Sequence, residues 1–270
     1  MRYFALFLLF FSLSVFPVCS QKKKKGNDVD KLFGKYSSYQ VVSSTLRGAS
    51  LYLISGHGGP DPGAIGKYHG KELHEDEYAY DIVLRLAREL LMRGAKVQVI
   101  IQDKKDGIRD DYVLKNSNRE QCMGDDIPLN QIDRLNQRCV AINKLYKTDW
   151  SQYKRSIFVH VDSRGAGKQT DVFFYYAPGS KKGKTLAENM HATFGKKYGE
   201  HQPNRGFTGT VSERSLYVLV NSQPVAAFLE LGNICNSQDQ KRLVIPSNRQ
   251  ALARWIADGI EKDYKRYKKK

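Results

Sequence analysis

Short hydrophobic runs and amphipathic stretches alternate along most of this chain. Ser50–Ser55 and Lys96–Ile101 are apolar runs of strand length, and between them His74–Met92 repeats apolar residues at helical spacing until Arg93 and Gly94 end the pattern. Apolar residues three and four apart mark one face of a helix, whereas short apolar runs bounded by turns are typical of buried strands. A strand, a helix and a second strand in this order predict two parallel strands joined by a right-handed crossover.

The same alternation continues toward the C-terminus. Helices are predicted at Leu129–Tyr146, Leu186–Tyr198 and Ser247–Tyr267, and strands at Ser156–Val161, Asp171–Tyr176, Leu216–Asn221 and Val225–Leu231. The polar stretch 29–48 is compatible with either a strand or a helix. Strands that alternate with helices indicate an α/β fold, here a three-layer sandwich with a mostly parallel central sheet flanked by helices on both faces.

Residues 103–128 interrupt this regular pattern. The segment is polar and charged throughout and comes just before the second predicted helix. A loop of this length inside a compact domain is usually either functional or disordered. We therefore interpret it as a candidate rim or lid of a cleft.

The first twenty residues have the features of an export signal. Arg2 supplies a positive start, Phe4–Phe16 is almost wholly apolar, and a cut before Gln21 is plausible. A lipoprotein cut before Cys19 is the alternative, but Val18 fits that kind of site poorly. The apolar run is too short for a good membrane span, so no transmembrane segment is expected in the mature chain. We expect an exported protein of the periplasm or cell surface.

Charge is concentrated near the two ends of the chain. The formal net charge is +16, and residues 22–25 and 262–270 contain ten Lys and Arg side chains but only one acid, Asp263. Such runs are usually solvated tails, although attraction to anionic wall or membrane polymers is the alternative. An exported chain without a nucleic-acid-binding motif is a poor candidate for binding nucleic acid. The predicted organisation is a signal at 1–20, a basic and polar lead-in at 21–48, a catalytic domain at 49–262 and a basic tail at 263–270.

The cysteines do not form a recognisable framework. After export three remain, Cys122, Cys139 and Cys235, and none has a CxxC partner. A sparse, odd set argues against a disulfide scaffold and against a thiolate zinc site. A single Cys122–Cys139 bridge is possible in an oxidising compartment, but the spacing does not require it.

Polar residues suited to metal chemistry occur where strands end. His57 lies in a glycine-rich turn after the first strand, His160 and Glu230 lie near the ends of later strands, and Glu75 opens the first helix. Ligands of open α/β sheets bind beyond the carboxyl ends of the strands, so these side chains could meet in one crevice. Two imidazoles and one carboxylate with an open position make a catalytic zinc site, and a further carboxylate can move protons.

Four blocks in this order resemble the zinc-dependent N-acetylmuramoyl-L-alanine amidases, the family often called Amidase_3. The first is Gly56–Gly66, which contains His57, and the second begins at Glu75; the others are Val159–Asp162 and Val225–Asn236. The resemblance covers about residues 50 to 260. It implies zinc held by His57, Glu75 and His160.

The resemblance also implies a reaction. Glu230 would be the catalytic acid and base, and the substrate would be peptidoglycan or a muropeptide, cut between N-acetylmuramic acid and the L-alanine of the stem peptide. Another zinc peptidase or deacylase on the same fold, or a non-catalytic wall-binding protein, remains an alternative. The sequence points to no particular activator protein.

Other assignments compete with these at several positions. Glu72, His74, Asp76 and Glu77 flank Glu75, and acids at a helix start often only complement its dipole. A histidine on an apolar strand, such as His160, is often a core residue whose ring nitrogens are hydrogen-bonded within the protein. His57 by itself fits an ordinary turn between a strand and a helix.

This chain also departs from the pattern of the family. The acid and proline that commonly precede the first Gly-His are Ile54 and Ser55, so a carboxylate that orients His57 must be missing or come from elsewhere. The remaining histidines have no matching block and are expected at the surface: His69, His191 and His201.

Overall fold

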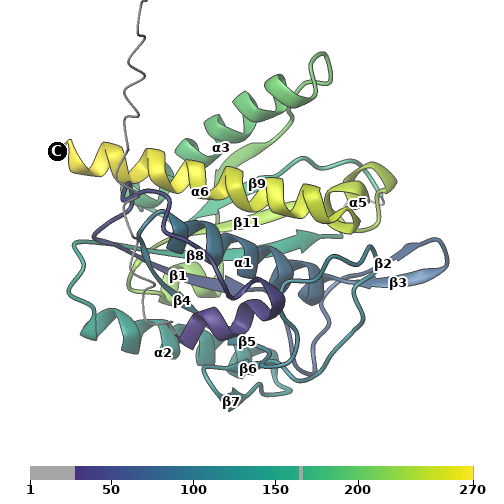
Figure 1. The fold of residues 1–270 in the computed structure, drawn as a ribbon, viewed down its shortest axis with the longest axis horizontal. Helices are drawn as coiled ribbons and strands as arrows, with labels where there is room; N and C mark the ends of the chain where they lie inside the picture. The colour runs from purple at the N-terminus through teal and green to yellow at the C-terminus, as the bar shows by residue number, and fades with distance from the viewer. Residues whose placement is uncertain (1–27, 164–166, 270) are drawn as a thin grey trace, which may run out of the picture.

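The computed structural model describes residues 28–163 and 167–269. The predicted signal at 1–20, with Cys19, and the lysine run 22–25 lie outside the described residues. A six-stranded sheet in the order β10-β9-β11-β8-β1-β4 forms the centre of the molecule (Figure 1). Its strands are β1 Ala49–Ser55, β4 Lys96–Val99, β8 Tyr153–Asp162, β9 Phe173–Tyr176, β10 Thr210–Glu213 and β11 Val225–Asn233.

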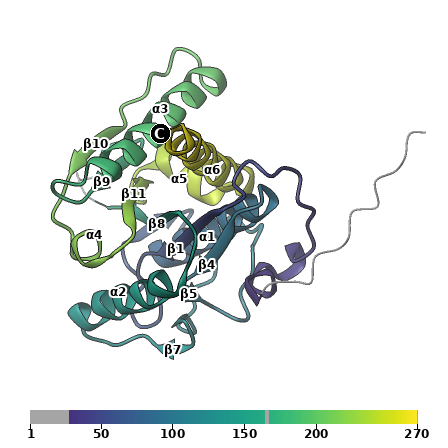
Figure 2. The same ribbon diagram turned by 90° about the vertical axis from the view of Figure 1, so that its left-hand side faces the viewer.

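Most neighbouring strands of this sheet are parallel. β4, β1, β8 and β11 run in one direction, whereas β9 is antiparallel to β11 and is itself paired in parallel with β10. Helices cover both faces of the sheet (Figure 2). The predicted three-layer α/β fold with a mostly parallel sheet is therefore confirmed.

Each face of the sheet has its own apolar layer. Helices α1 (Glu75–Met92), α3 (Lys181–His201) and α6 (Pro246–Lys268) cover one face, and α2 (Gln131–Thr148) and α4 (Tyr217–Asn221) cover the other. Side chains of a strand alternate between faces, and in β1 Leu51 and Leu53 join the first layer while Tyr52 and Ile54 join the second. The remaining helix, α5 (Ser237–Val244), follows β11 and packs against α6.

A buried ion-pair network fixes α6 against α1. Arg249 of α6 is fully buried, and its Nε lies 2.6 Å from Asp81 Oδ2 of α1. Arg85 Nε lies 2.7 Å from the same oxygen. A buried arginine is tolerated only when its donors are used, and Arg249 also donates to the backbone oxygens of Arg109 and Asp111.

The prediction of a strand at Leu216–Asn221 is wrong. Its β-branched and aromatic residues favour a strand by composition, but residues 217–221 form the short helix α4, in which the backbone N–H groups of Leu219 and Val220 donate to Leu216 O. The adjacent residues Val218 and Leu219 are both buried, whereas Tyr217 is 37% exposed. A helix can bury two consecutive side chains on one face, which a strand cannot.

Several small elements were not predicted from the sequence. A hairpin of β2 (Ile65–Tyr68) and β3 (Lys71–His74) extends from the glycine-rich turn. In the stretch 29–48, where the sequence is compatible with a strand or a helix, the structure has a 3₁₀ helix at Asp28–Tyr36. Strand β10 and helix α5 were also missed, because each is short and has few apolar residues.

The segment 103–128 packs against the rest of the fold. Two short strands near its end, β6 (Gln121–Cys122) and β7 (Asp125–Asp126), pair with β5 (Ile101–Gln102) into a small antiparallel sheet. Ile108 and Leu114 are buried, so the segment is anchored at these positions although it is irregular. Within the described ranges, no helix is both long enough and apolar enough to cross a membrane.

Candidate metal centre

The turn after β1 has a backbone that glycine makes possible. His57 itself has φ 58°, and Gly58 and Gly59 follow with φ 99° and 62°. A single bridge between Gly58 and Asp61 closes the turn. Left-handed backbone is costly for a residue with a Cβ, and its presence at a histidine marks a position that the surrounding contacts hold in place.

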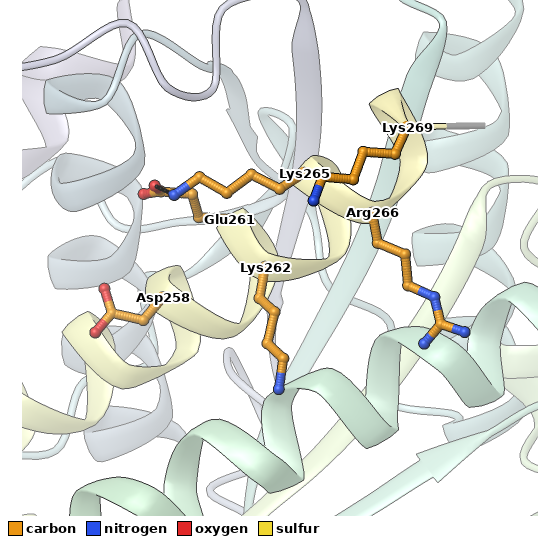
Figure 3. A pocket seen from close by; sticks show the side chains of 6 residues that line it. All are labelled: Asp258, Glu261, Lys262, Lys265, Arg266 and Lys269. Carbon is orange, nitrogen blue, oxygen red and sulfur yellow. Dashed lines mark ion pairs between the residues drawn. The ribbon is translucent and has the colours of Figure 1, made fainter.

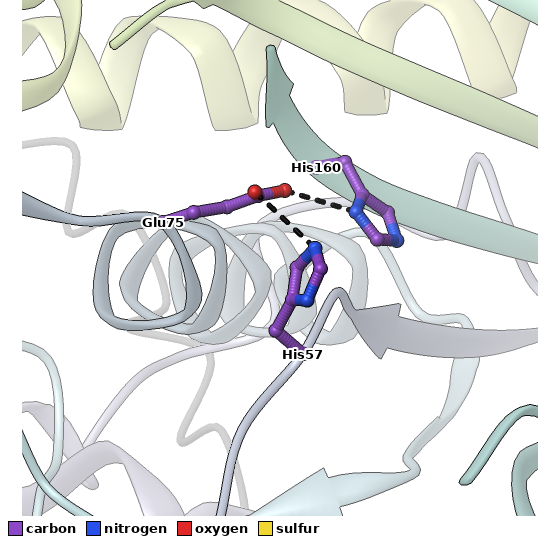
Figure 4. A group of neighbouring side chains, drawn as sticks. All are labelled: His57, Glu75 and His160. Carbon is purple, nitrogen blue, oxygen red and sulfur yellow. Dashed lines mark hydrogen bonds and ion pairs between the residues drawn. The ribbon is translucent and has the colours of Figure 1, made fainter. Parts of the chain in front are cut away.

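The turn brings His57 to two side chains that are distant in the sequence. His57 Nε2 lies 3.2 Å from Glu75 Oε2, and His160 Nδ1 lies 2.9 Å from Glu75 Oε1 (Figure 4). One donor atom from each of the three lies within 4.8 Å of the others. The structure thus brings together the three residues that the sequence singled out as ligands, from a turn, a helix start and a strand.

The competing side chains around Glu75 do not belong to this donor group. Glu72 is exposed and contacts His74 at 3.2 Å, and neither belongs to the group of donors. Glu75 is 4% exposed, and its carboxylate also accepts hydrogen bonds from the backbone N–H groups of Ala64 (2.9 Å) and Val161 (3.0 Å). These amides fix both carboxylate oxygens between the two imidazoles.

Two glycines leave room for these side chains. A Cβ on Gly56 would lie 2.3 Å from the imidazole of His160, and a Cβ on Gly63 would lie 2.7 Å from Glu75 Oε2. Gly63 also has φ 69°, which disfavours any other residue. The glycines of the first block therefore serve the packing of the donor group as well as the turn.

A carboxylate orients His57 from within the turn. Asp61 Oδ2 accepts a hydrogen bond from His57 Nδ1 at 2.9 Å and another from Arg134 Nη2 of α2 at 2.8 Å. Asp61 thereby takes the place of the acid that is missing before Gly56. The sequence left open where this carboxylate comes from, and the four-residue spacing from His57 within a tight turn was the available signal.

A second arginine of α2 supports the same turn. Arg138 is 4% exposed and donates to the backbone oxygen of His57. Both arginines point from α2 toward the turn and lie at the same small cavity as the two imidazoles. Helix α2 thus holds the turn in place with positive charge.

Burial and hydrogen bonding together set the proton affinities of the group. Burial alone would lower the pKa of His57, but its bonds to Asp61 and Glu75 raise that pKa to about 10. The bond from His57 lowers the pKa of Asp61 to about 2. Burial would raise the pKa of Glu75, but the two imidazoles hold it well below its usual range. Burial lowers the pKa of His160.

Glu230 lies on the strand beside His160. The register of β11 against β8 pairs Glu230 with His160, and Phe228, two residues earlier, stacks on the His160 ring at 4.3 Å between centroids. Residues two apart share a face of the sheet, so Glu230 is placed on the same side as Phe228. Its side chain is partly exposed.

Two of the donors, His57 and His160, line a small cavity between β1, β8 and α2. This cavity has a volume of about 30 Å³, and Ser55, Phe158 and Val218 contribute to its wall. A cavity of about 520 Å³ lies at the C-terminal end of α6 and has a different character (Figure 3). Its lining is charged and contains ion pairs such as Lys265–Glu261 at 2.6 Å, with no histidine or cysteine to hold a transition metal.

The remaining histidines and cysteines lie outside the donor group. His69 and His201 are exposed as predicted, whereas His191 is only partly exposed because its ring packs against Phe207 and its Nε2 bonds Gly209 O. The cysteines at 122, 139 and 235 are free thiols, the first two buried and the third exposed.

Comparison with known proteins identifies the family. Residues 51–262 match the family described as N-acetylmuramoyl-L-alanine amidase. The chain belongs to this family. As an N-acetylmuramoyl-L-alanine amidase, it is an enzyme that hydrolyses peptidoglycan at the amide between N-acetylmuramic acid and L-alanine.

Relatives of the amidase have diverged far in sequence. It is 26% identical over 236 residues to the germination-specific N-acetylmuramoyl-L-alanine amidase of Bacillus subtilis, with 84% of this chain and 85% of the relative covered. It is 25% identical to the probable cell wall amidase LytH of Staphylococcus epidermidis, with 82% of this chain and 60% of that protein covered.

Solved structures share the fold. The CwlD amidase of Clostridioides difficile, solved in complex with the GerS lipoprotein, gives a TM-score of 0.58 at 19% identity over 80% of this chain and 98% of that one. The amidase Ami1 of Mycobacterium smegmatis gives a TM-score of 0.57 at 17% identity, with 80% of this chain and 96% of that one covered.

Proposed function

We propose that the amidase uses one zinc ion held by His57, Glu75 and His160, with Glu230 as the catalytic acid and base. The observation that carries the proposal is the convergence of two imidazoles and one carboxylate within 4.8 Å. This nitrogen and oxygen set is the one zinc prefers in catalytic sites, where three protein ligands leave a position for water or substrate. When bound, zinc supplies Lewis-acid chemistry that lowers the pKa of water toward about 7 and polarises a carbonyl.

The residues of the chain supply the rest of the reaction. Glu230 accepts a proton from the attacking water and gives it to the leaving nitrogen of L-alanine. Asp61 keeps His57 oriented through Nδ1, and Glu75 is held by the amides of Ala64 and Val161. The products are a glycan with a free lactyl carboxyl group and a stem peptide with a free L-alanine amino group.

Two variants separate metal binding from proton transfer. Glu230→Gln keeps the shape of the side chain but cannot accept the proton, and we expect stoichiometric zinc with hydrolysis reduced about 10²- to 10⁴-fold. His57→Ala removes a ligand, and we expect loss of both zinc and hydrolysis. Glu188→Gln, at an exposed position of α3, is the matched control.

Mass analysis of muropeptides with and without a chelator tests the reaction itself. Release of stem peptides that begin with free L-alanine, abolished by the chelator and restored by zinc, supports the proposal. Cleavage at other peptide bonds would point to a different zinc peptidase. Normal turnover by Glu230→Gln would remove Glu230 from the mechanism.

We also propose that the chain is exported and that residues 49–262 form the catalytic domain. The basic start and apolar run at Arg2–Phe16 support export, as does a substrate that lies outside the cytoplasmic membrane. N-terminal sequencing of the protein from the cell envelope tests the cut before Gln21, and a diacylated Cys19 would show lipoprotein processing instead.

A further inference from the structure

A second group of acids lies in the interior next to the proposed zinc ligands. Asp76 and Glu77 belong to the first turn of α1, directly after Glu75, and Glu120 comes from the segment 103–128. Their exposed fractions are 3%, 1% and 5%. Each offers an oxygen within 4.8 Å of the others.

The partners of these carboxylates compensate only part of their charge. Arg109 Nη2 lies 2.8 Å from Glu77 Oε2, and Glu120 Oε2 accepts a hydrogen bond from Gly59 N at 2.9 Å. Asp76 Oδ1 accepts from Glu77 N at 2.9 Å. Asp76 Oδ2, however, is buried and has no hydrogen-bond partner in residues 28–163 and 167–269.

The charge balance therefore favours a cation. When all three are ionised, the carboxylates and one guanidinium carry a formal charge of −2, of which the positive end of the α1 dipole offsets about half an elementary charge. Burying a carboxylate without a partner for its charge costs roughly several kcal/mol, because the charge loses its hydration. A divalent ion would compensate the charge and give Asp76 Oδ2 a partner.

The donor chemistry selects the kind of ion. All three donors are oxygens, which suit hard cations, in contrast to the imidazoles of the neighbouring group. Calcium binds oxygen at about 2.3–2.6 Å and magnesium at about 2.0–2.1 Å. Oxygens within 4.8 Å of one another can share one calcium ion, whose coordination geometry is flexible, whereas magnesium demands a near-ideal octahedron.

We infer that Asp76, Glu77 and Glu120 form a second cation site that binds calcium. The ion joins the segment 103–128 to the first turn of α1, and so it steadies the helix start that carries Glu75. It supports the fold and plays no part in the hydrolytic step. The site stands on its own donors, so it does not depend on the assignment of Glu230 or of zinc.

Calcium binding to the full chain loaded with one equivalent of zinc tests the site. Titration calorimetry is expected to give one calcium per chain with a dissociation constant on the order of 10⁻⁵ to 10⁻³ M. Calcium should raise the melting temperature and slow proteolysis within residues 103–128, and magnesium should do so more weakly. No binding of calcium up to about 5 mM would overturn the inference.

Two substitutions identify the donors without removing side-chain volume. Asp76→Asn and Glu120→Gln each remove one charge, and Gln can still accept the hydrogen bond from Gly59 N. Both are expected to weaken calcium binding at least about tenfold while the chain still binds one zinc. Because Asp76→Asn also relieves repulsion between acids, it should be at least as stable as the parent protein in calcium-free buffer.

The exposed Asp125→Asn is the matched control and should bind calcium like the parent protein. Unchanged calcium affinity in Asp76→Asn would overturn the assignment. Lower stability of Asp76→Asn in calcium-free buffer would also count against it, because that result would show a carboxylate already satisfied by the protein.

Discussion

Replacing Asp61 by asparagine is expected to loosen the hold on zinc without removing a ligand. The carboxylate serves three donors, with Oδ2 accepting from His57 Nδ1 and Arg134 Nη2 and Oδ1 accepting from Gly63 N. Asparagine has only one oxygen. Its NH2 group must therefore face either the imidazole and guanidinium pair or the backbone N–H of Gly63. In both orientations one N–H donor faces another, and at least one hydrogen bond is lost.

The structure allows the size of this effect to be estimated. A hydrogen bond to a charged partner contributes about 1.5–3 kcal/mol. Loss of one such bond corresponds to a zinc affinity that is weaker by roughly 10- to 150-fold, because about 1.4 kcal/mol is a factor of ten. Substitutions of groups that orient a metal-binding histidine commonly cost about 10- to 100-fold in metal affinity. We therefore expect Asp61→Asn to bind zinc about 10- to 100-fold more weakly.

Competition with a chromogenic chelator measures this affinity directly. Activity on muropeptides should recover in large part at saturating zinc, because His57, Glu75, His160 and Glu230 are unchanged. Asp125→Asn, an exposed aspartate outside the site, controls for the loss of one negative charge. A zinc affinity of Asp61→Asn equal to that of the parent protein would refute the orienting role.

Other parts of the fold give further expectations. Gly56→Ala places a Cβ 2.3 Å from the His160 ring, so the imidazole must move; zinc stoichiometry measured by elemental analysis should fall well below one. Arg249→Ala leaves Asp81 with fewer partners in a fully buried site and should cost about 3–5 kcal/mol of unfolding free energy in a urea titration; a loss under about 1 kcal/mol would contradict it. The pKa of His57 is near 10 in the folded metal-free protein, so His57 binds a proton more tightly there than in the unfolded chain. This difference stabilises the fold fully below about pH 6.5, and the stabilisation is lost as the pH rises toward 10. Zinc binding near neutral pH should accordingly release about one proton, which calorimetry in buffers of different ionisation enthalpy would detect.

Residues that lie in strongly periodic stretches could be placed from the sequence. The strand before His57, the helix after Glu75 and the strand containing His160 each have a pattern that local packing dictates, and all three lie where predicted. Because parallel strands end at one edge of a sheet, the meeting of these side chains also follows from the fold class. Their roles as zinc ligands remain a proposal.

Features that depend on tertiary contacts could not be read in this way. The strand predicted at residues 216–221 is a helix because it caps the apolar layer beside α2, a partner that composition does not reveal. The role of Asp61 depends on how one turn bends, and the meeting of Glu120 with Asp76 depends on the path of an irregular segment. Neither has a periodic signal in the sequence.

Helix α6 has a consequence for how the chain reaches its final state. It is the last element of the described residues, yet it packs against both α1 and α3 and contributes Ile256 and Ile260 to the larger apolar layer. That layer stays uncovered until residues 246–268 become available. A polypeptide emerging stepwise from a ribosome would therefore delay its cooperative folding until α6 has emerged. Removal of the last turns of α6 should therefore destabilise the whole layer and not only the helix itself.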